Sequence, residues 1–252
     1  MNQQPTVRGT PRTVVLTLQR FILLLARYWF LIAMLLTGAI LASGFLAPAF
    51  MAEGQPQAGE AIYRFLAPHN HQLPQRSYFL FGRTGGVQTY SLEELLAFGA
   101  NPRNLQNFVG SAEIGYKTAL NHRMIAIFTG IFIGGMMWVL TGQRLRLSFI
   151  WFLPFALPLI FDGLSHMVSE NSGEGFRQSN TWAVTLTGGG LPASFYSGTT
   201  FGTLNWLLRT VTGLLFGLGL AWFLFPYLAR RFMSIRLRLE PRLKKIATAE
   251  KV

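Results

Sequence analysis

Cysteine is absent from this chain, and charged residues are scarce. Without a thiol there is no disulfide, no thiolate metal ligand and no cysteine nucleophile. Asp, Glu, Lys and Arg make up 13% of the 252 residues, whereas an ordinary soluble domain carries about 25%. Half of the residues are hydrophobic, so we expect much of the surface to face lipid. The sequence also lacks a phosphate-binding glycine loop, a HExxH pair and a nucleophile elbow.

Four apolar segments are long enough to cross a bilayer, which takes roughly 20 helical residues. They comprise residues 29–50, 124–141, 149–168 and 206–227. Helix is the expected conformation, because an unpaired backbone group in lipid costs several kcal/mol. The first segment exceeds the roughly 7–15 apolar residues of a secretory signal peptide, which favours an uncleaved span. The pattern predicts an all-α polytopic membrane protein with about four transmembrane helices, the third bent by two prolines.

The charges predict how the chain is oriented. We divide it into a basic N-terminal segment (1–28), a membrane domain (29–227) with long loops at 51–123 and 169–205, and a basic tail (228–252). With both termini in the cytoplasm, 14 of the 22 basic residues lie there against two of the 10 acidic ones. The whole net charge of +12 then sits on one side, as the positive-inside rule expects. We predict a multi-pass protein of the bacterial inner membrane.

The basic ends also bear on partners. A pI near 10.9 would suggest nucleic acid in a soluble protein. Here the basic residues flank membrane spans, so we expect no nucleic acid and assign both ends to the surface of anionic lipid. Docking of these ends onto another membrane subunit is the alternative.

The two long loops are predicted to pack together as a structured cap on the outer side of the membrane. The first contains a short helix at 59–66, and a second helix begins after Ser91. Ser91 is its N-cap, and Glu94 occupies the position that completes a capping box.

The histidines are all predicted on the outer side, which makes them candidates for a metal site. Asp162 and His166 are four residues apart and share one helical face. Imidazole groups clustered in this way can bind zinc, copper or iron. Three interpretations are open: structural hydrogen bonds between loops and helix ends, which we favour, a metal or cofactor site, and acid–base catalysis. The candidate cluster consists of His69, His71, His122, His166 and Asp162.

Two further patterns concern helix packing. Asp162 is the one acid in a predicted span and Arg209 the one base in the fourth, so we expect them to form an ion pair. Gly130 and Gly134 in the second span, and Gly213 and Gly217 in the fourth, form GxxxG patterns. These patterns predict close helix contacts, either within the chain or with a second subunit.

Several stretches resemble the prokaryotic membrane proteins grouped as domain of unknown function 2085. They read HQLPQRSYFLFG at 71–82, ALNHR at 119–123, FDGLSH at 161–166, FRQSNTW at 176–182, LPASFY at 191–196 and TGLLFG at 212–217. The resemblance implies a multi-span membrane protein without an assigned activity. Where that family typically has cysteine, this chain has Asn70 and Asn121. Asparagine is a poor ligand for a soft metal, so we expect a structural polar network of Asn70, Arg76, Asn121, Arg123, Asp162 and Arg209.

These observations predict an accessory or scaffold subunit of a larger membrane complex, such as a respiratory or photosynthetic one, without catalysis of its own. Its partners are then the lipid bilayer and other membrane subunits. One alternative is a metal- or cofactor-binding membrane protein, a candidate enzyme, that uses His71, His122 and His166. The other is a small-solute transporter or channel around Asp162 and Arg209.

Overall fold

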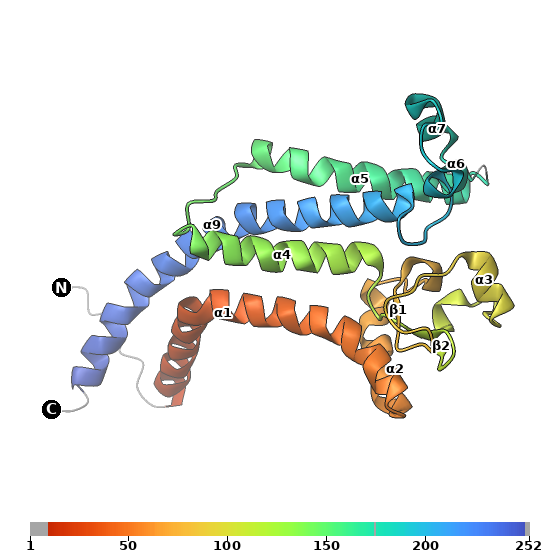
Figure 1. Cartoon of the computed structure of the whole chain (residues 1–252). Coiled ribbons are helices and arrows are strands. Elements are labelled where there is room, and N and C mark those ends of the chain that lie inside the picture. Colours follow the sequence, from red (N-terminus) through yellow and green to blue (C-terminus); the bar gives the residue numbers. More distant parts are fainter. Residues whose placement is uncertain (1–9, 174, 250–252) are drawn as a thin grey trace. The chain divides into compact units, whose positions relative to one another are not determined.

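Four long helices form the membrane part of the protein. The computed structural model describes residues 10–173 and 175–249, and four of its helices are long and apolar enough to cross a membrane. They are α1 (Thr10–Ala52), α4 (His122–Leu140), α5 (Phe149–Asn171) and α9 (Leu204–Ala249) (Figure 1). The predicted all-α membrane fold is therefore confirmed, and the chain is a multi-pass membrane protein in a lipid bilayer.

The first and last of these helices extend well beyond the predicted spans. α1 has 43 residues and α9 has 46, whereas roughly 20 residues cross a bilayer. The basic segments predicted to lie on the membrane surface therefore continue the spanning helices without a break. The chain divides into two compact units, a larger one of residues 36–223 and a terminal unit of residues 1–35 and 224–252.

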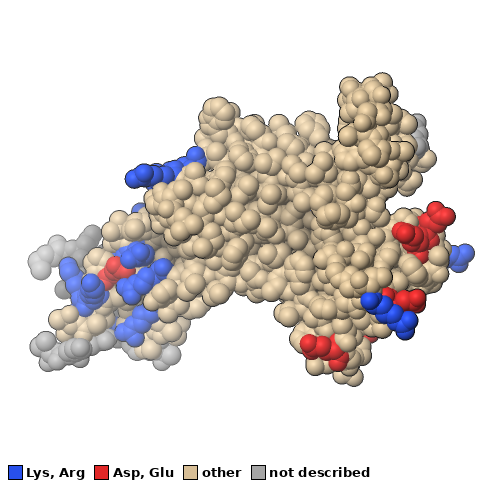
Figure 2. All heavy atoms as spheres, viewed as in Figure 1, with Lys and Arg blue, Asp and Glu red and all other residues tan. Residues whose placement is uncertain are grey.

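The terminal unit is held by aromatic rings and an ion pair. The Trp29 ring stacks on Phe232 at 5.5 Å between centroids and meets Phe225 edge-on at 5.8 Å. The Arg27 guanidinium lies 3.0 Å from the carboxylate of Glu240. Lys and Arg side chains gather on the surface of this unit (Figure 2). Such a basic surface suits contact with anionic lipid headgroups.

Within the larger unit, α4 and α9 approach each other through glycine. A methyl group added at Gly130 would lie 3.0 Å from the Cα atom of Gly217, and one added at Gly134 would lie 2.9 Å from the Cβ atom of Ala221. Trp222 of α9 donates from Nε1 to the carbonyl oxygen of Gly134 at 3.1 Å. The two GxxxG patterns therefore serve packing within the chain, as the first of the two interpretations had it.

The first long loop folds into the larger part of a cap, which we define as residues 53–121, 172–173 and 175–203. Its helices are α2 (Pro56–Leu66) and α3 (Leu92–Ala97), with 3₁₀ turns at Ala67–His69, Pro74–Arg76 and Leu105–Asn107. Three short strands, β1 (Phe79–Leu80), β2 (Gly110–Ser111) and β3 (Gly115–Lys117), form an antiparallel sheet in the order β1-β3-β2. The capping box is confirmed, because Ser91 Oγ accepts from Glu94 N and Glu94 Oε2 accepts from Ser91 N.

The second long loop contributes α6 (Phe176–Ser179), α7 (Thr181–Thr187) and α8 (Ala193–Tyr196). It contacts the first loop through two hydrogen bonds: Thr199 Oγ1 donates to Gln75 O at 2.7 Å, and Phe201 N donates to Thr89 Oγ1 at 2.8 Å. The prediction that the two loops pack together is confirmed.

The interior of the cap contains a lysine without solvent exposure, Lys117. Its Nζ atom donates to the carbonyl oxygens of Gln72 at 2.8 Å and Gln106 at 2.6 Å, and lies 5.9 Å from the centroid of the Tyr63 ring. Burial lowers the pKa of Lys117 to about 7, because the ammonium group loses its hydration.

This shift predicts a pH dependence of stability. Between pH 7 and the ordinary lysine pKa of about 10.4, the unfolded chain binds a proton that the folded chain does not. The free energy of unfolding should therefore rise with pH across this window, by up to about 4 kcal/mol, and Lys117 should contribute no slope below pH 7. Denaturant titrations of the detergent-purified protein at pH 7 and pH 9.5 measure the rise. The Lys117→Met variant should lose it, and an unchanged slope in that variant would contradict the assignment.

Candidate functional site

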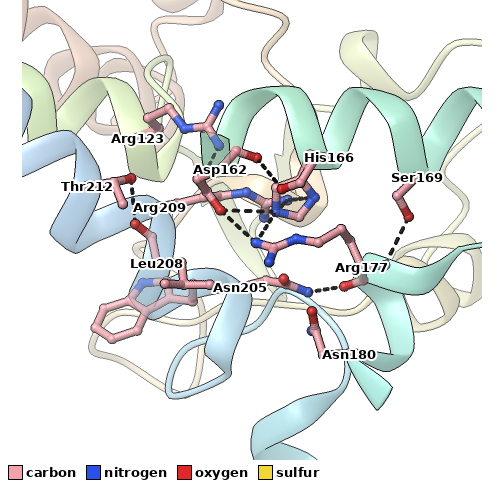
Figure 3. A network of polar contacts seen from close by, with 12 residues as sticks. Arg123, Asp162, His166, Ser169, Arg177, Asn180, Asn205, Leu208, Arg209 and Thr212 are labelled. Atoms are coloured by element: carbon pink, nitrogen blue, oxygen red, sulfur yellow. Dashed lines mark hydrogen bonds and ion pairs between the residues drawn. The ribbon is translucent and has the colours of Figure 1, made fainter. Parts of the chain in front are cut away.

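A buried carboxylate lies where the cap meets the helices. Asp162 of α5 is 6% exposed, and each of its carboxylate oxygens contacts one arginine. Oδ2 lies 2.6 Å from Nη2 of Arg123 on α4, and Oδ1 lies 2.6 Å from Nη2 of Arg177 on α6 (Figure 3). One carboxylate thus joins three helices, two from the membrane part and one from the cap.

The predicted ion pair between Asp162 and Arg209 is wrong. Arg209 instead directs Nη2 to the ring of His166, 3.3 Å from each ring nitrogen. Arg177 also reaches Nε2 of His166, at 3.1 Å. The physical reason is competition: both oxygens of Asp162 are occupied by Arg123 and Arg177, so Arg209 meets the imidazole one turn further along α5.

Arg177 is the residue that our sequence-based prediction missed. Its backbone is fixed on both sides, because its N–H donates to Ser169 Oγ at 2.9 Å and its carbonyl accepts from Asn205 Nδ2 at 2.5 Å. Gly175 and Asn180, at the two ends of α6, have positive φ values of 59° and 44°. Gly175 and Asn180 both tolerate positive φ, so their spacing beside a span was the available sequence signal for a short helix between them.

Arg76 is the fourth arginine of this group. It pairs with Glu170 of α5, whose side chain is half exposed. Burial and, second to it, the charge of the nearby Arg123 lower the pKa of Arg76 to about 10, although Asp162 acts in the opposite direction. We refer to Arg76, Arg123, Arg177 and Arg209 as the arginine cluster.

Asn70 and Asn121, the two asparagines of the predicted network, contact each other directly. Asn121 is the N-cap of α4: its Oδ1 accepts from Met124 N at 2.9 Å, and its Nδ2 donates to Asn70 Oδ1 at 2.6 Å. Asn70 in turn donates to the carbonyl oxygen of Ala119 at 2.8 Å. The six residues of the predicted polar network therefore fall into two groups, this asparagine pair and the residues around Asp162.

The candidate histidines lie in different surroundings. His71 is exposed, and His122 is the first residue of α4 and packs against the Tyr78 ring at 4.3 Å between centroids. His166 faces arginine side chains, and the side chain of His69 lies outside the described residues. Among the described side chains, no three His, Asp or Glu residues gather closely enough to hold a metal ion. The guanidinium groups beside His166 would also repel a metal cation.

The fold and this site define a multi-pass membrane protein in which a buried network of arginine and carboxylate side chains joins a cap to the helix ends. No family model, no curated protein and no solved structure matches the chain. The resemblance to domain of unknown function 2085 accordingly stays a prediction from the sequence.

Proposed function

We propose that this protein is an accessory or scaffold subunit of a larger membrane complex, without catalysis of its own. The observation that carries the proposal is the use of Asp162, whose two oxygens fix α4, α5 and α6 together. Asn121 and Asn70 likewise join the start of α4 to the first loop. Polar side chains at the cap boundary thus fix the folded cap to the membrane helices, as a scaffold subunit requires.

The two alternatives find less support in the site. A metal centre at His166 would place a cation beside Arg177 and Arg209, at a cost in electrostatic energy. A transport path centred on Asp162 and Arg209 requires charges that are free to rearrange. Asp162, however, is held on both oxygens by guanidinium groups at 2.6 Å.

Co-migration with a partner tests the scaffold proposal. The tagged chain would be extracted from its native membrane in a mild detergent and run on a native gel, followed by cross-linking mass spectrometry. We expect a complex much larger than the 28.2 kDa of the chain, with a stoichiometric partner cross-linked to it. A lone monomer under several mild detergents would argue against a scaffold role.

We further propose that the cap lies outside the cytoplasm of a bacterial cell, with both termini inside. The turn between α4 and α5 supports this orientation, since it carries Arg144 and Arg146, has no acidic residue and lies at the helix ends remote from the cap. The basic terminal unit belongs on the same side by the same rule.

Single cysteines can test the orientation cleanly, because the natural chain has none. We expect Val87→Cys, at an exposed position of the cap, to react with a membrane-impermeant maleimide in intact cells. Ser148→Cys, in the turn before α5, should react only after the cells are permeabilised. The reverse pattern would overturn the orientation, and labelling of the cysteine-free chain measures the background.

A further inference from the structure

A cavity of about 740 Å³ opens between the cap and the ends of α5 and α9. This volume lies within the range of about 300–1,000 Å³ that is typical of small-molecule sites. Three members of the arginine cluster, Arg76, Arg177 and Arg209, line it. Polar side chains surround them, among them Gln75, Ser91, His166, Gln178 and Asn205.

The charges around this cavity do not balance among the described residues. The arginine cluster supplies four positive charges, whereas Asp162 and Glu170 supply two negative ones. Asp162 is shared by Arg123 and Arg177, and Glu170 pairs with Arg76. In the described part of the chain, Arg209 has the His166 ring as its partner and no carboxylate, although it is only 3% exposed. A buried charge without a counter-ion is costly, so a negative group in the cavity would offset this cost.

We propose that the cavity binds a small organic dianion, either a phosphate monoester or a dicarboxylate. The planar guanidinium group bonds phosphate and carboxylate oxygens in pairs, which makes arginine the residue suited to such ligands. A ligand with two negative charges would balance the excess of two positive charges among the described residues. This proposal concerns a binding site and does not depend on the scaffold role proposed above.

Unused hydrogen-bonding groups refine the ligand class. Among the described residues, Nη1 of Arg209 and Nε of Arg177 are buried donors that find no partner, and Oδ1 of Asn205 is a buried acceptor that finds none. All three residues line the cavity. A buried polar group that is left unpaired destabilises the fold. A ligand that carries a hydroxyl group next to its anionic group would supply both the acceptors and the donor that these atoms lack.

The ligand could be dissolved or anchored in the membrane. A second, mostly apolar cavity of about 590 Å³, lined by Pro158, Phe161 and Leu208 among others, shares Arg177 with the first. Phe161 is 66% exposed on the membrane part of α5, so this second cavity can be entered from lipid. A phosphate monoester is found both on soluble compounds and as the headgroup of phosphatidic acid, and the experiment has one arm for each.

Calorimetric titration of the detergent-purified protein tests the soluble arm, with inorganic phosphate, glycerol 3-phosphate and succinate as probes and glycerol as the uncharged comparison. In the lipid arm, the protein is placed in phosphatidylcholine nanodiscs with or without phosphatidic acid, and retained lipid is counted by native mass spectrometry. We expect saturable binding of at least one dianion, and none of glycerol. If a soluble phosphate compound saturates the site, the ligand is a soluble compound. If one molecule of phosphatidic acid is retained and no soluble compound binds, the ligand is a lipid.

Three variants separate this site from unspecific attraction. Arg209→Gln removes the cation of the cluster that has no carboxylate partner among the described residues, and we expect binding about tenfold weaker or more. Gln178→Glu adds a negative charge at an exposed position of the cavity wall without touching the buried network, and it should weaken binding similarly if the first variant does not fold. Arg83→Gln removes an exposed cap charge away from the cavity lining and should bind like the natural protein. Absence of saturable binding, or equal binding by all variants, would overturn the proposal.

Discussion

Replacing Asp162 by asparagine is expected to lower the free energy of unfolding by about 3–5 kcal/mol, as is typical when one partner of a buried ion pair is removed. The carboxylate is 6% exposed and contacts Arg123 and Arg177 at 2.6 Å each. Asparagine has the same shape but offers one oxygen and no charge. Two guanidinium groups would then lie next to a neutral amide, in a region that already holds more positive than negative charge.

Unfolding by denaturant in detergent micelles measures this loss. Glu170→Gln is the matched control, because it also removes a carboxylate that pairs with one arginine of the cluster. The Glu170 side chain is half exposed, so its loss should cost less than about 1 kcal/mol. A double variant, Asp162→Asn with Arg177→Gln, should lose less than the sum of the two single variants, since the residues contact each other. Equal losses for Asp162→Asn and Glu170→Gln would show that the network does not stabilise the fold.

The membrane part of the fold follows from patterns that are local in the sequence. Four apolar runs predicted the four long helices, because lipid permits few other conformations. The capping box of Ser91 and Glu94 identified α3 because this pattern is also local: its four hydrogen-bonding groups lie within four residues. The lengths of α1 and α9 could not be obtained in this way. Apolarity marks where a helix can cross the bilayer, whereas these helices continue through basic sequence that forms the terminal unit.

Most residues of the charged site could be predicted from the sequence, but their pairing could be predicted only in part. Asp162, His166, Arg123 and Arg209 were all singled out, and all lie in the network. The wrong partner was predicted for Asp162 because depth in the membrane was the only guide to pairing. Since α5 and α9 run antiparallel, Asp162 and Arg209 were expected at a similar depth. Arg177 comes from a loop, and a loop residue is placed by hydrogen bonds such as those to Ser169 and Asn205. These contacts depend on the folded chain and have no periodic signal.

Acidic and basic residues near the cap differ in where they lie: the acids are on the surface and several of the bases are in the interior. The acidic residues of its described part, Glu53, Glu60, Glu93, Glu94 and Glu113, are exposed, and several appear on the cap surface in Figure 2. Arg177 and Arg209, by contrast, are buried. The interior near the helix ends is thus positive although the predicted outer half of the protein carries equal numbers of acids and bases. An exposed carboxylate is screened by water and neutralises a buried cation poorly, which strengthens the case for an anion in the cavity.

Gly217→Ala is the second change expected to have a large effect. A methyl group at this position would overlap with the carbonyl oxygen of Ile127, and would lie 2.8 Å from the nitrogen of Ile131 and 2.9 Å from the Cα atom of Gly130. All three are backbone atoms of α4, so no side chain can rotate away to make room. Helices α4 and α9 must separate, and we expect a loss of about 3 kcal/mol, at the upper end of the usual cost of overpacking.

Gly38→Ala is the control for the change of residue type. A methyl group there would lie 3.5 Å from the Phe132 ring, which is an ordinary contact. Alanine forms helix more readily than glycine by up to about 1 kcal/mol, so this variant should be as stable as the natural protein or slightly more so. Thermal unfolding in the same detergent compares the two. If Gly217→Ala were no less stable than Gly38→Ala, the close approach of α4 and α9 would not be required for the stability of the fold.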